Sequence, residues 1–285
     1  MPDPSEINRI VRDIDELPTI PTVANRILEL TTNMESTSIS ELGKTIAADE
    51  ALTVKILKIS NSPFYGCQRE ISTVPRAIMI LGLSAIKNLV MAASIEQVYK
   101  RFGLKEQLLW EHSIGCAIAS HIIAKKVRFA HSEEALSGGL LHDIGKVVLN
   151  TKTPERYQTI VERVYNNGEI FFDVENEEYG FNHCDVGIHV VKKWNLSQAL
   201  EHVVFSHHEH IASLPLDSDI REFIAVVSFA DLCCLKLGIG YKSAQEHVDL
   251  ENCSAIEILK FAKDEIDALL PEIREAYEKE KSLFS

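Results

Sequence analysis

Two polar residues interrupt an apolar stretch of this chain. His142 and Asp143 stand side by side within a mostly apolar run from Gly138 to Leu149, and Lys146 follows three residues later. An unpaired buried charge is costly, so Asp143 needs a cation or hydrogen-bond donors beside it. On a helix, the Lys146 ammonium would project from the same face as Asp143. The fold must therefore bring further polar groups to this segment, and the trio itself suits phosphate chemistry.

The hydrophobic pattern predicts an all-α protein. Apolar residues recur at spacings of three and four along the chain, whereas strict alternation of apolar and polar residues is almost absent. Residues suited to capping precede several helical segments, namely Asp49, Asn182 and Ser197. Gly82 is placed to end a helix, and Pro271 is placed to start a last, charged one.

Composition is that of an ordinary globular protein. The 285 residues are enough for one large domain or two small ones with a substantial core. A formal charge of −13 disfavours nucleic-acid binding, because a phosphate backbone would be repelled. The first residues do not resemble a secretory signal, and no apolar run approaches the roughly 20 residues that span a bilayer. We therefore expect a cytoplasmic protein with no membrane segment.

The cysteines give no sign of a zinc ribbon or a redox motif. Six are present, and none forms a Cys-x-x-Cys pair. We interpret them as reduced and mostly buried small hydrophobic residues. Cys184 is of most interest, because it adjoins His183.

Further imidazoles and carboxylates lie in or beside the apolar helical patterns. Such groups suit first-row transition metals, and facing helices can bring them to one site. The candidate ligands, in chain order, are His112, His142, Asp143, His183, His207, His208 and Asp231. Adjacent residues on a helix diverge by about 100°, so His207 and His208 can reach one site only near a helix end.

In this order the residues resemble the HD-domain superfamily of metal-dependent phosphohydrolases. More narrowly, the segment from Leu17 to His210 resembles an HDOD domain, the HD-related output domain of bacterial signalling proteins. The segments that carry this resemblance are Leu17-Pro18-Thr19-Ile20-Pro21, Asp49-Glu50-Ala51-Leu52, Ile59-Ser60-Asn61-Ser62, Ala77-Ile78-Met79-Ile80-Leu81-Gly82 and Gly139-Leu140-Leu141-His142-Asp143-Ile144-Gly145-Lys146. Roughly seven tenths of the chain is covered, and the order of the motifs is more specific than any one of them.

The resemblance implies a multi-helical, HD-domain/PDEase-like fold with two helical lobes. The HDOD domain would span residues 17–212, divided into an N-terminal lobe at 17–104 and a metal-binding lobe at 105–212. An apolar helix over 219–237, with Asp231 near its middle, would complete the second lobe. Residues 241–285 would form a separate C-terminal helical segment suited to a partner surface.

The resemblance also implies roles for the site residues. Asp143 would bridge two ions, and Lys146 would contact phosphate, which makes these two the candidate catalytic residues. The expected cofactor is one or two divalent ions, iron or manganese first and zinc as the alternative. The pair His207-His208 and the position of His112 are similar to the HD-GYP branch, and Glu209 and His210 could orient a ligand. Residues 210–215 lack the Gly-Tyr-Pro of that branch, which argues against cyclic-dinucleotide hydrolysis.

Several interpretations stay open on the sequence alone. The first is a regulatory HDOD protein that binds metal and acts through unidentified signalling protein partners. The alternative is an active metal-dependent phosphohydrolase with a nucleotide or another phosphoester as substrate. A third is a metal-free interaction scaffold, in which the histidines are hydrogen-bonded core residues and Lys146 is a helix-end cation.

Overall fold

The computed structural model describes residues 4–12, 27, 39–62, 65, 70–99, 104–130 and 132–281, and these contain helices and no strand. The all-α prediction is therefore confirmed. Residues 17–21, the first segment of the HDOD resemblance, lie outside the described part. Within it, no single helix is both long and apolar enough to cross a membrane.

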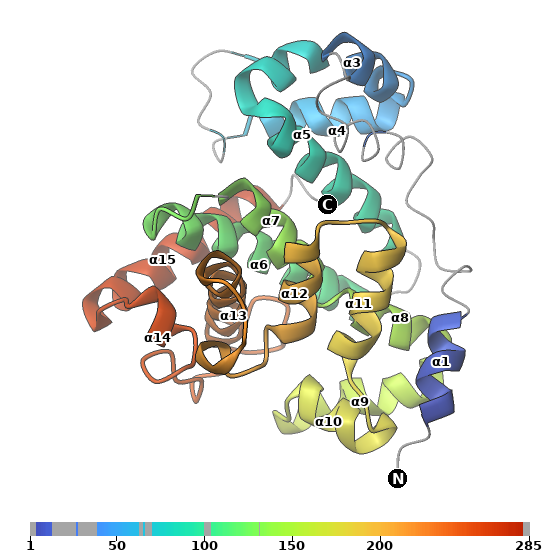
Figure 1. Ribbon diagram of the computed structural model, residues 1–285, viewed down its shortest axis with the longest axis vertical. Helices are drawn as coiled ribbons and strands as arrows, with labels where there is room; N and C mark the ends of the chain where they lie inside the picture. The colour runs from blue at the N-terminus through green and yellow to red at the C-terminus, as the bar shows by residue number, and fades with distance from the viewer. Residues whose placement is uncertain are drawn as a thin grey trace.

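In the first lobe, two short helices pack on the N-terminal half of a long one. The short helices are α3 (Ile39–Ala47) and α4 (Glu50–Ser60), and the long helix is α5 (Val74–Tyr99). Asp49 caps α4 as predicted, since its Oδ1 accepts from the Leu52 backbone N–H at 3.0 Å. Gly82 breaks the helical geometry of α5 with a φ of 85°, a value that suits glycine because it has no Cβ. The C-terminal half of α5 then runs down to the second lobe (Figure 1).

The second lobe is built around a central pair of helices, α6 (Leu104–Lys126) and α7 (Ser132–Leu141). Helix α13 (Ser218–Leu237) packs on both, close to the predicted range of 219–237. Helices α8 (Ile144–Lys152), α11 (His183–Lys193) and α12 (Gln198–Ser206) form a second layer, in which α11 packs on both α8 and α12.

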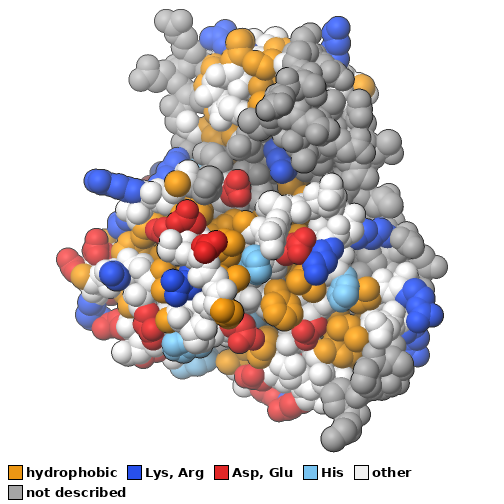
Figure 2. Space-filling view, viewed as in Figure 1, with side chains coloured by type: hydrophobic (Ala, Val, Ile, Leu, Met, Phe, Trp, Pro, Cys, Tyr) orange, Lys and Arg blue, Asp and Glu red, His pale blue; other side chains and the backbone are white. Residues whose placement is uncertain are grey.

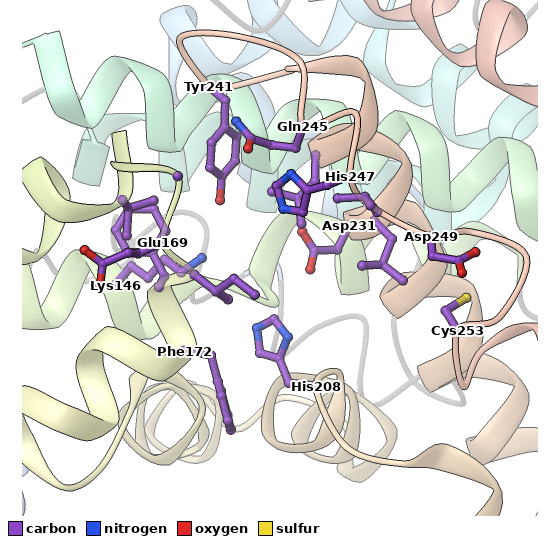
Figure 3. A pocket seen from close by; sticks show the side chains of 17 residues that line it. Lys146, Glu169, Phe172, His208, Asp231, Tyr241, Gln245, His247, Asp249 and Cys253 are labelled. Carbon is purple, nitrogen blue, oxygen red and sulfur yellow. The ribbon is translucent and has the colours of Figure 1, made fainter. Parts of the chain in front are cut away.

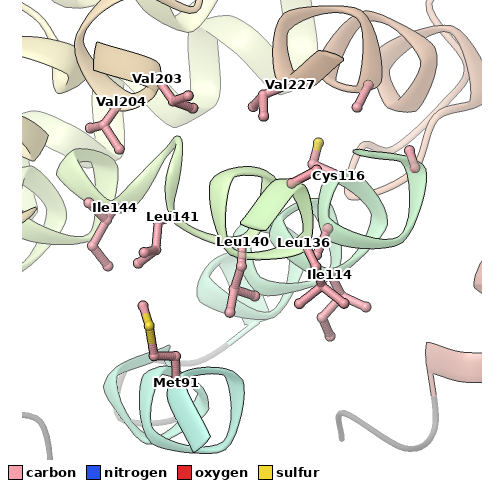
Figure 4. Close-up of a cluster of buried hydrophobic side chains, with 14 of the residues drawn as sticks. Met91, Ile114, Cys116, Leu136, Leu140, Leu141, Ile144, Val203, Val204 and Val227 are labelled. Carbon is pink, nitrogen blue, oxygen red and sulfur yellow. The ribbon is translucent and has the colours of Figure 1, made fainter. Parts of the chain in front are cut away.

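An apolar contact joins the two lobes. Met91 of α5 faces Leu140, Leu141 and Ile144, and Val203 and Val204 of α12 lie on the opposite side of α7 and α8 (Figure 4). All six side chains are buried. The turn between α7 and α8, which holds His142 and Asp143, is thus fixed from both sides by core packing.

The caps predicted for α11 and α12 are confirmed. Asn182 accepts from the Cys184 backbone N–H, and Asp185 completes a capping box by accepting from the Asn182 N–H at 2.9 Å. Ser197 Oγ accepts from the Leu200 N–H at 3.4 Å. Helix α12 ends at Ser206, so His207 and His208 stand at a helix end as their joint role required.

Two further helices and the N-terminal helix cover the outer side of this layer. Helices α9 (Pro154–Asn167) and α10 (Phe171–Tyr179) pack on each other, and α9 also packs on α8. Helix α1 (Pro4–Arg12) lies beside α8 and α11 rather than on the first lobe (Figure 1). Its Glu6 accepts from Arg156 at 2.8 Å.

The C-terminal residues pack on the second lobe through α14 (Ile256–Leu259) and α15 (Lys263–Glu280). The prediction that Pro271 starts a helix is wrong, because Pro271 lies inside α15. Buried residues at helical spacing continue through it, namely Ile266, Leu269, Ile273 and Tyr277. Their burial outweighs the backbone hydrogen bond that proline cannot donate. The domain boundaries at 212 and 241 stay a prediction.

Charges are mixed on the surface of the second lobe. Figure 2 shows acidic and basic side chains interspersed over the described residues of one face, with apolar side chains between them.

Candidate metal centre

All seven predicted ligands converge at one place between α6, α8, α11, α12 and α13. His142 and Asp143 occupy the turn between α7 and α8, and His183 is the first residue of α11. The residues are buried, apart from a partly exposed His208. The sequence therefore predicted which side chains meet, although they are spread over about 120 positions of the chain, from His112 to Asp231.

Asp143 lies at the centre of this cluster. Its Oδ1 is 3.2 Å from His183 Nε2 and 3.8 Å from His207 Nε2. Its Oδ2 is 3.3 Å from His142 Nε2 and 3.6 Å from His112 Nε2. Each carboxylate oxygen thus faces two imidazoles, which suits the bridging position that the resemblance implies.

A close approach of two helices places His183 beside Asp143. A Cβ on Gly145 of α8 would overlap the carbonyl oxygen of His183 and would lie 2.9 Å from the backbone N of Gly187 in α11. No larger residue fits there without moving one helix away from the other. Gly145, which the HDOD resemblance includes in its motif, is therefore needed for the packing that forms the site.

The Nδ1 atoms of four histidines are held by acceptors outside the cluster. His142 Nδ1 donates to Gly139 O at 2.7 Å, and His112 Nδ1 donates to Ile239 O at 3.1 Å. His207 Nδ1 faces the carbonyl oxygens of Val203 and Val204, and His183 Nδ1 donates to Glu175 Oε2 at 2.6 Å. These acceptors place a hydrogen on Nδ1 in each ring, and each Nε2 is directed into the cluster, where a bound cation could take its lone pair.

Imidazole nitrogens lie close to one another inside the cluster, and two of its polar atoms have no hydrogen-bond partner in the described part of the chain. His183 Nε2 is 3.4 Å from His207 Nε2 and 3.2 Å from His208 Nε2. His142 Nε2 and Asp143 Oδ1 are buried without a hydrogen-bond partner among the described residues. Buried acceptors that face one another are unfavourable unless a proton or a metal cation lies between them. The donor set therefore fits one or more divalent ions.

His112 and Asp231 form the side of the cluster nearest α13. His112 Nε2 is 3.0 Å from Asp231 Oδ1, and the same nitrogen is 3.4 Å from the Sγ of Cys116. Cys116 was not among the predicted ligands, although it follows His112 by four residues and so shares its face of α6. Both residues are buried.

Glu175 is a buried carboxylate that the sequence analysis missed. Its Oε2 accepts from both Nδ1 and the backbone N–H of His183, at 2.6 and 2.7 Å. Its Oε1 accepts from the Tyr157 hydroxyl at 2.8 Å. The residue stands in a run with Glu177 and Glu178, and nothing in the sequence marks it as the buried member.

Electrostatics support a charged Asp143–Lys146 pair at the site. Burial would raise the pKa of Asp143, but His142 and Lys146 outweigh it and hold that pKa well below its usual range. Burial alone would lower the pKa of Lys146. The Asp143 carboxylate, whose Oδ2 lies 2.6 Å from Lys146 Nζ, raises that pKa instead. Burial and His183 lower the pKa of His208 to about 3, which keeps this imidazole neutral and able to bind metal.

A pocket of about 280 Å³ opens onto the cluster. Lys146, His208 and Asp231 reach it from the site, and Phe171, Phe172 and Tyr241 supply aromatic walls (Figure 3). Lys146 also lies over the Phe171 ring, 4.5 Å from its centroid. His247 lines the same pocket.

Three other residues of interest in the sequence lie at the edge of the cluster or beyond it. Cys184 Sγ contacts His207 at Nδ1, 3.8 Å away, which is the outward side of that ring. His210 is exposed and pairs with Glu257 at 3.5 Å, and Glu209 is also exposed. The prediction that His210 or Glu209 orients a ligand is therefore wrong, since the chain turns outward directly after His208.

The chain matches the HDOD domain family model over residues 17–210. An HDOD domain protein of unknown function from Geobacter sulfurreducens shares the fold with a TM-score of 0.77 and 27% identity, covering 97% of this chain and 99% of that one. A protein from Shewanella amazonensis SB2B, named as a candidate metal-dependent phosphohydrolase, shares the fold at 18% identity and a TM-score of 0.68, covering 99% and 98% of the two chains.

A curated relative extends beyond this chain. It is an uncharacterized protein of Treponema pallidum (strain Nichols), 24% identical over 229 residues, which are 77% of this chain and 42% of the relative. This chain therefore matches less than half of that relative's length. The family match covers more than half of the present sequence, so the chain belongs to the HDOD domain family.

Proposed function

We propose that this protein binds one or two divalent metal ions and hydrolyses a small phosphoester at the site they form. The observation that carries the proposal is the orientation of the imidazoles, whose Nδ1 atoms are held from outside while their Nε2 atoms face Asp143 and Asp231. The ligands would be His112, His142, Asp143, His183, His207, His208 and Asp231. Iron and manganese suit such nitrogen and oxygen donors, and so does zinc.

Such ions, when bound, lower the pKa of coordinated water and neutralise charge on phosphate oxygens. The protein's own groups would position the substrate. Lys146 reaches the pocket with an ammonium that burial would otherwise disfavour, and it could pair with a phosphate oxygen. The aromatic walls formed by Phe171, Phe172 and Tyr241 could hold an apolar or aromatic part of the ester, such as a nucleobase.

A regulatory role without turnover is the second candidate. Val54, Met79 and Ile80 are large apolar residues of the first lobe that are 60%, 67% and 48% exposed, and none belongs to the metal site. Exposed apolar side chains are common at protein-binding surfaces. A signalling partner could bind this lobe, and metal occupancy of the second lobe could then have a structural role.

Metal content tests the first part of the proposal. The protein would be purified without oxygen and without a chelating column, beside Asp143→Ala, Asp143→Asn and the control Asp173→Ala, whose side chain is exposed on α10. We expect about one or two equivalents of iron, manganese or zinc in the wild type and in the control, and a large loss in both Asp143 variants. Less than about a tenth of an equivalent in the wild type would refute metal binding.

Turnover distinguishes the two candidate functions. A panel of nucleotides and a generic phosphodiester would be assayed with manganese or iron. Hydrolysis that is lost in Asp143→Asn and kept in Asp173→Ala is the expected result. Bound metal together with no turnover above that of Asp143→Asn would reject hydrolysis and leave the regulatory role.

A further inference from the structure

We propose that Cys116 is an additional metal ligand, which gives this site one sulfur-containing position formed by His112, Cys116, His142 and Asp231. The inference rests on the metal site proposed above and adds a specific donor to it. One ligand atom from each of the four residues lies within 4.8 Å of all the others. All four residues are buried.

The direction of the Cys116 side chain supports this role. Cys116 lies one helical turn after His112 on α6, and its Sγ is 3.4 Å from His112 Nε2 but 4.0 Å from Nδ1. The Nε2 atom is the inward nitrogen, because it also lies 3.0 Å from Asp231 Oδ1. The thiol is therefore on the side of the ring where a metal ion would bind.

A second observation at the same position points to a ligand. His142 Nε2 is fully buried and has no hydrogen-bond partner among the described residues. Its Nδ1 is already engaged with the Gly139 carbonyl oxygen. The free nitrogen belongs to the same group of four donors, so a cation held by His112, Cys116 and Asp231 would also satisfy it.

Cys184 provides a contrast on the opposite side of the cluster. It is also buried and also contacts a candidate ligand, but its Sγ faces His207 Nδ1, which is directed at the carbonyl oxygens of Val203 and Val204. No imidazole lone pair is available on that side of the ring. One ligand atom from each of His183, Cys184, His207 and His208 also lies within 4.8 Å of the others. The Cys184 sulfur, however, is on the side of the His207 ring that faces carbonyl oxygens, so we assign nitrogen donors alone to this second position.

The two positions should consequently prefer different metals. A thiolate favours zinc, iron(II) and cobalt(II) over harder ions such as magnesium and manganese. When the metal–sulfur bond forms, the Cys116 thiol releases its proton to solvent. We expect the sulfur-containing position to retain zinc or iron most strongly, and the imidazole position next to the pocket to accept manganese as well.

Cobalt(II) binding tests the proposal without any need for activity. Protein stripped of metal would be titrated with cobalt(II) and its absorption followed from the near ultraviolet to the visible. A cysteine thiolate bound to cobalt gives a near-ultraviolet charge-transfer band, whereas any bound cobalt gives weak visible bands. We expect the near-ultraviolet band in the wild type and in the control Cys184→Ser, and its loss in Cys116→Ser and Cys116→Ala.

The outcomes separate this inference from the proposed function. Cobalt that binds with visible bands but no charge-transfer band in the wild type would refute the role of Cys116 and leave the metal site intact. A band that survives in both Cys116 variants, or that disappears in Cys184→Ser, would also refute it. No cobalt binding at all would reject both proposals. If a Cys116 variant does not fold, the absence of the band in the wild type, or its loss in Cys184→Ser, still refutes the proposal.

Discussion

The carboxylate of Glu175 holds His183 through two hydrogen bonds, one from the ring Nδ1 and one from the backbone N–H. A carboxylate in this position fixes the tautomer and the orientation of an imidazole whose other nitrogen binds metal. We therefore expect Glu175→Gln to weaken metal binding by about 10- to 100-fold, measured by competition with a chelator of known affinity.

Tyr157→Phe is the matched control for that experiment. It removes the hydroxyl that donates to Oε1 of Glu175 and leaves in place both hydrogen bonds that Oε2 accepts from His183. Metal affinity should change much less than in Glu175→Gln. Equal losses in the two variants would mean that Glu175 acts through general packing between α9 and α10 rather than through His183.

Lys146 should matter for anion binding more than for metal binding. The pocket lining contains one lysine and no arginine among the described residues, so a phosphate there has a single fixed cationic side chain to meet. Lys146→Met keeps an unbranched side chain, one atom shorter, and removes the charge. We expect metal content to be retained, and affinity for inorganic phosphate, measured by calorimetry on metal-loaded protein, to fall by about 100-fold.

Lys152→Met, at the other end of α8, controls for the loss of one positive charge. It should leave phosphate affinity unchanged because Lys152 does not line the pocket. If Lys146→Met bound phosphate as tightly as the wild type, the substrate-positioning role proposed for this lysine would be wrong.

The metal site could be predicted largely from sequence because its ligands are chemically conspicuous. Histidines and aspartates within apolar helical patterns need partners, and seven such residues proved to be partners of one another. The caps Asn182 and Ser197 could be predicted for a similar reason, since each side chain satisfies a backbone N–H within three residues.

The residues that support the ligands could not be predicted in the same way. Glu175 looks like its exposed neighbour Glu177, and only the packing of α9, α10 and α11 makes it a buried acceptor. Cys116 did carry a signal, the spacing of four from His112, but one cysteine on an apolar helix is usually a packing residue. Pro271 was predicted wrongly as a helix start because proline is common in the first turn of a helix. In α15, burial of apolar residues on both sides of Pro271 outweighs that local preference.

Gly145→Ala should disrupt the contact between α8 and α11. The added methyl group would overlap the His183 carbonyl oxygen, and it is backbone rather than a movable side chain that stands in the way. We expect a loss of about 3 kcal/mol or more in the free energy of unfolding, together with weaker metal binding, because His183 must move. Chemical denaturation of the metal-free protein measures the first effect.

Gly187→Ala is the control from the facing helix. Its added methyl group would meet the Val204 side chain at 2.7 Å, and that side chain can rotate or shift. The expected loss is smaller, about 1 to 2 kcal/mol. A Gly145→Ala protein as stable as the wild type would show that the two helices are not held at the distance seen here.

His121 should make the stability of the second lobe depend on pH. The residue is buried in α6, away from the metal site, and burial together with Lys125 lowers its pKa from 6.5 to about 4. Between pH 4 and pH 6.5, His121 therefore binds a proton more readily in the unfolded chain than in the folded one. The free energy of unfolding should fall as pH decreases from about 6.5, and the full difference below pH 4 corresponds to about 3 kcal/mol.

His121→Gln isolates this contribution. Lys125, Lys126 and Glu272, which line the same groove as His121, are present in both proteins, so their own effects cancel in the comparison. Urea unfolding of metal-free protein at pH 7 and pH 5 should show the wild type losing about 2 kcal/mol more than the variant on acidification. A His121→Gln protein that loses as much stability as the wild type would mean that another group, and not His121, takes up the proton on unfolding.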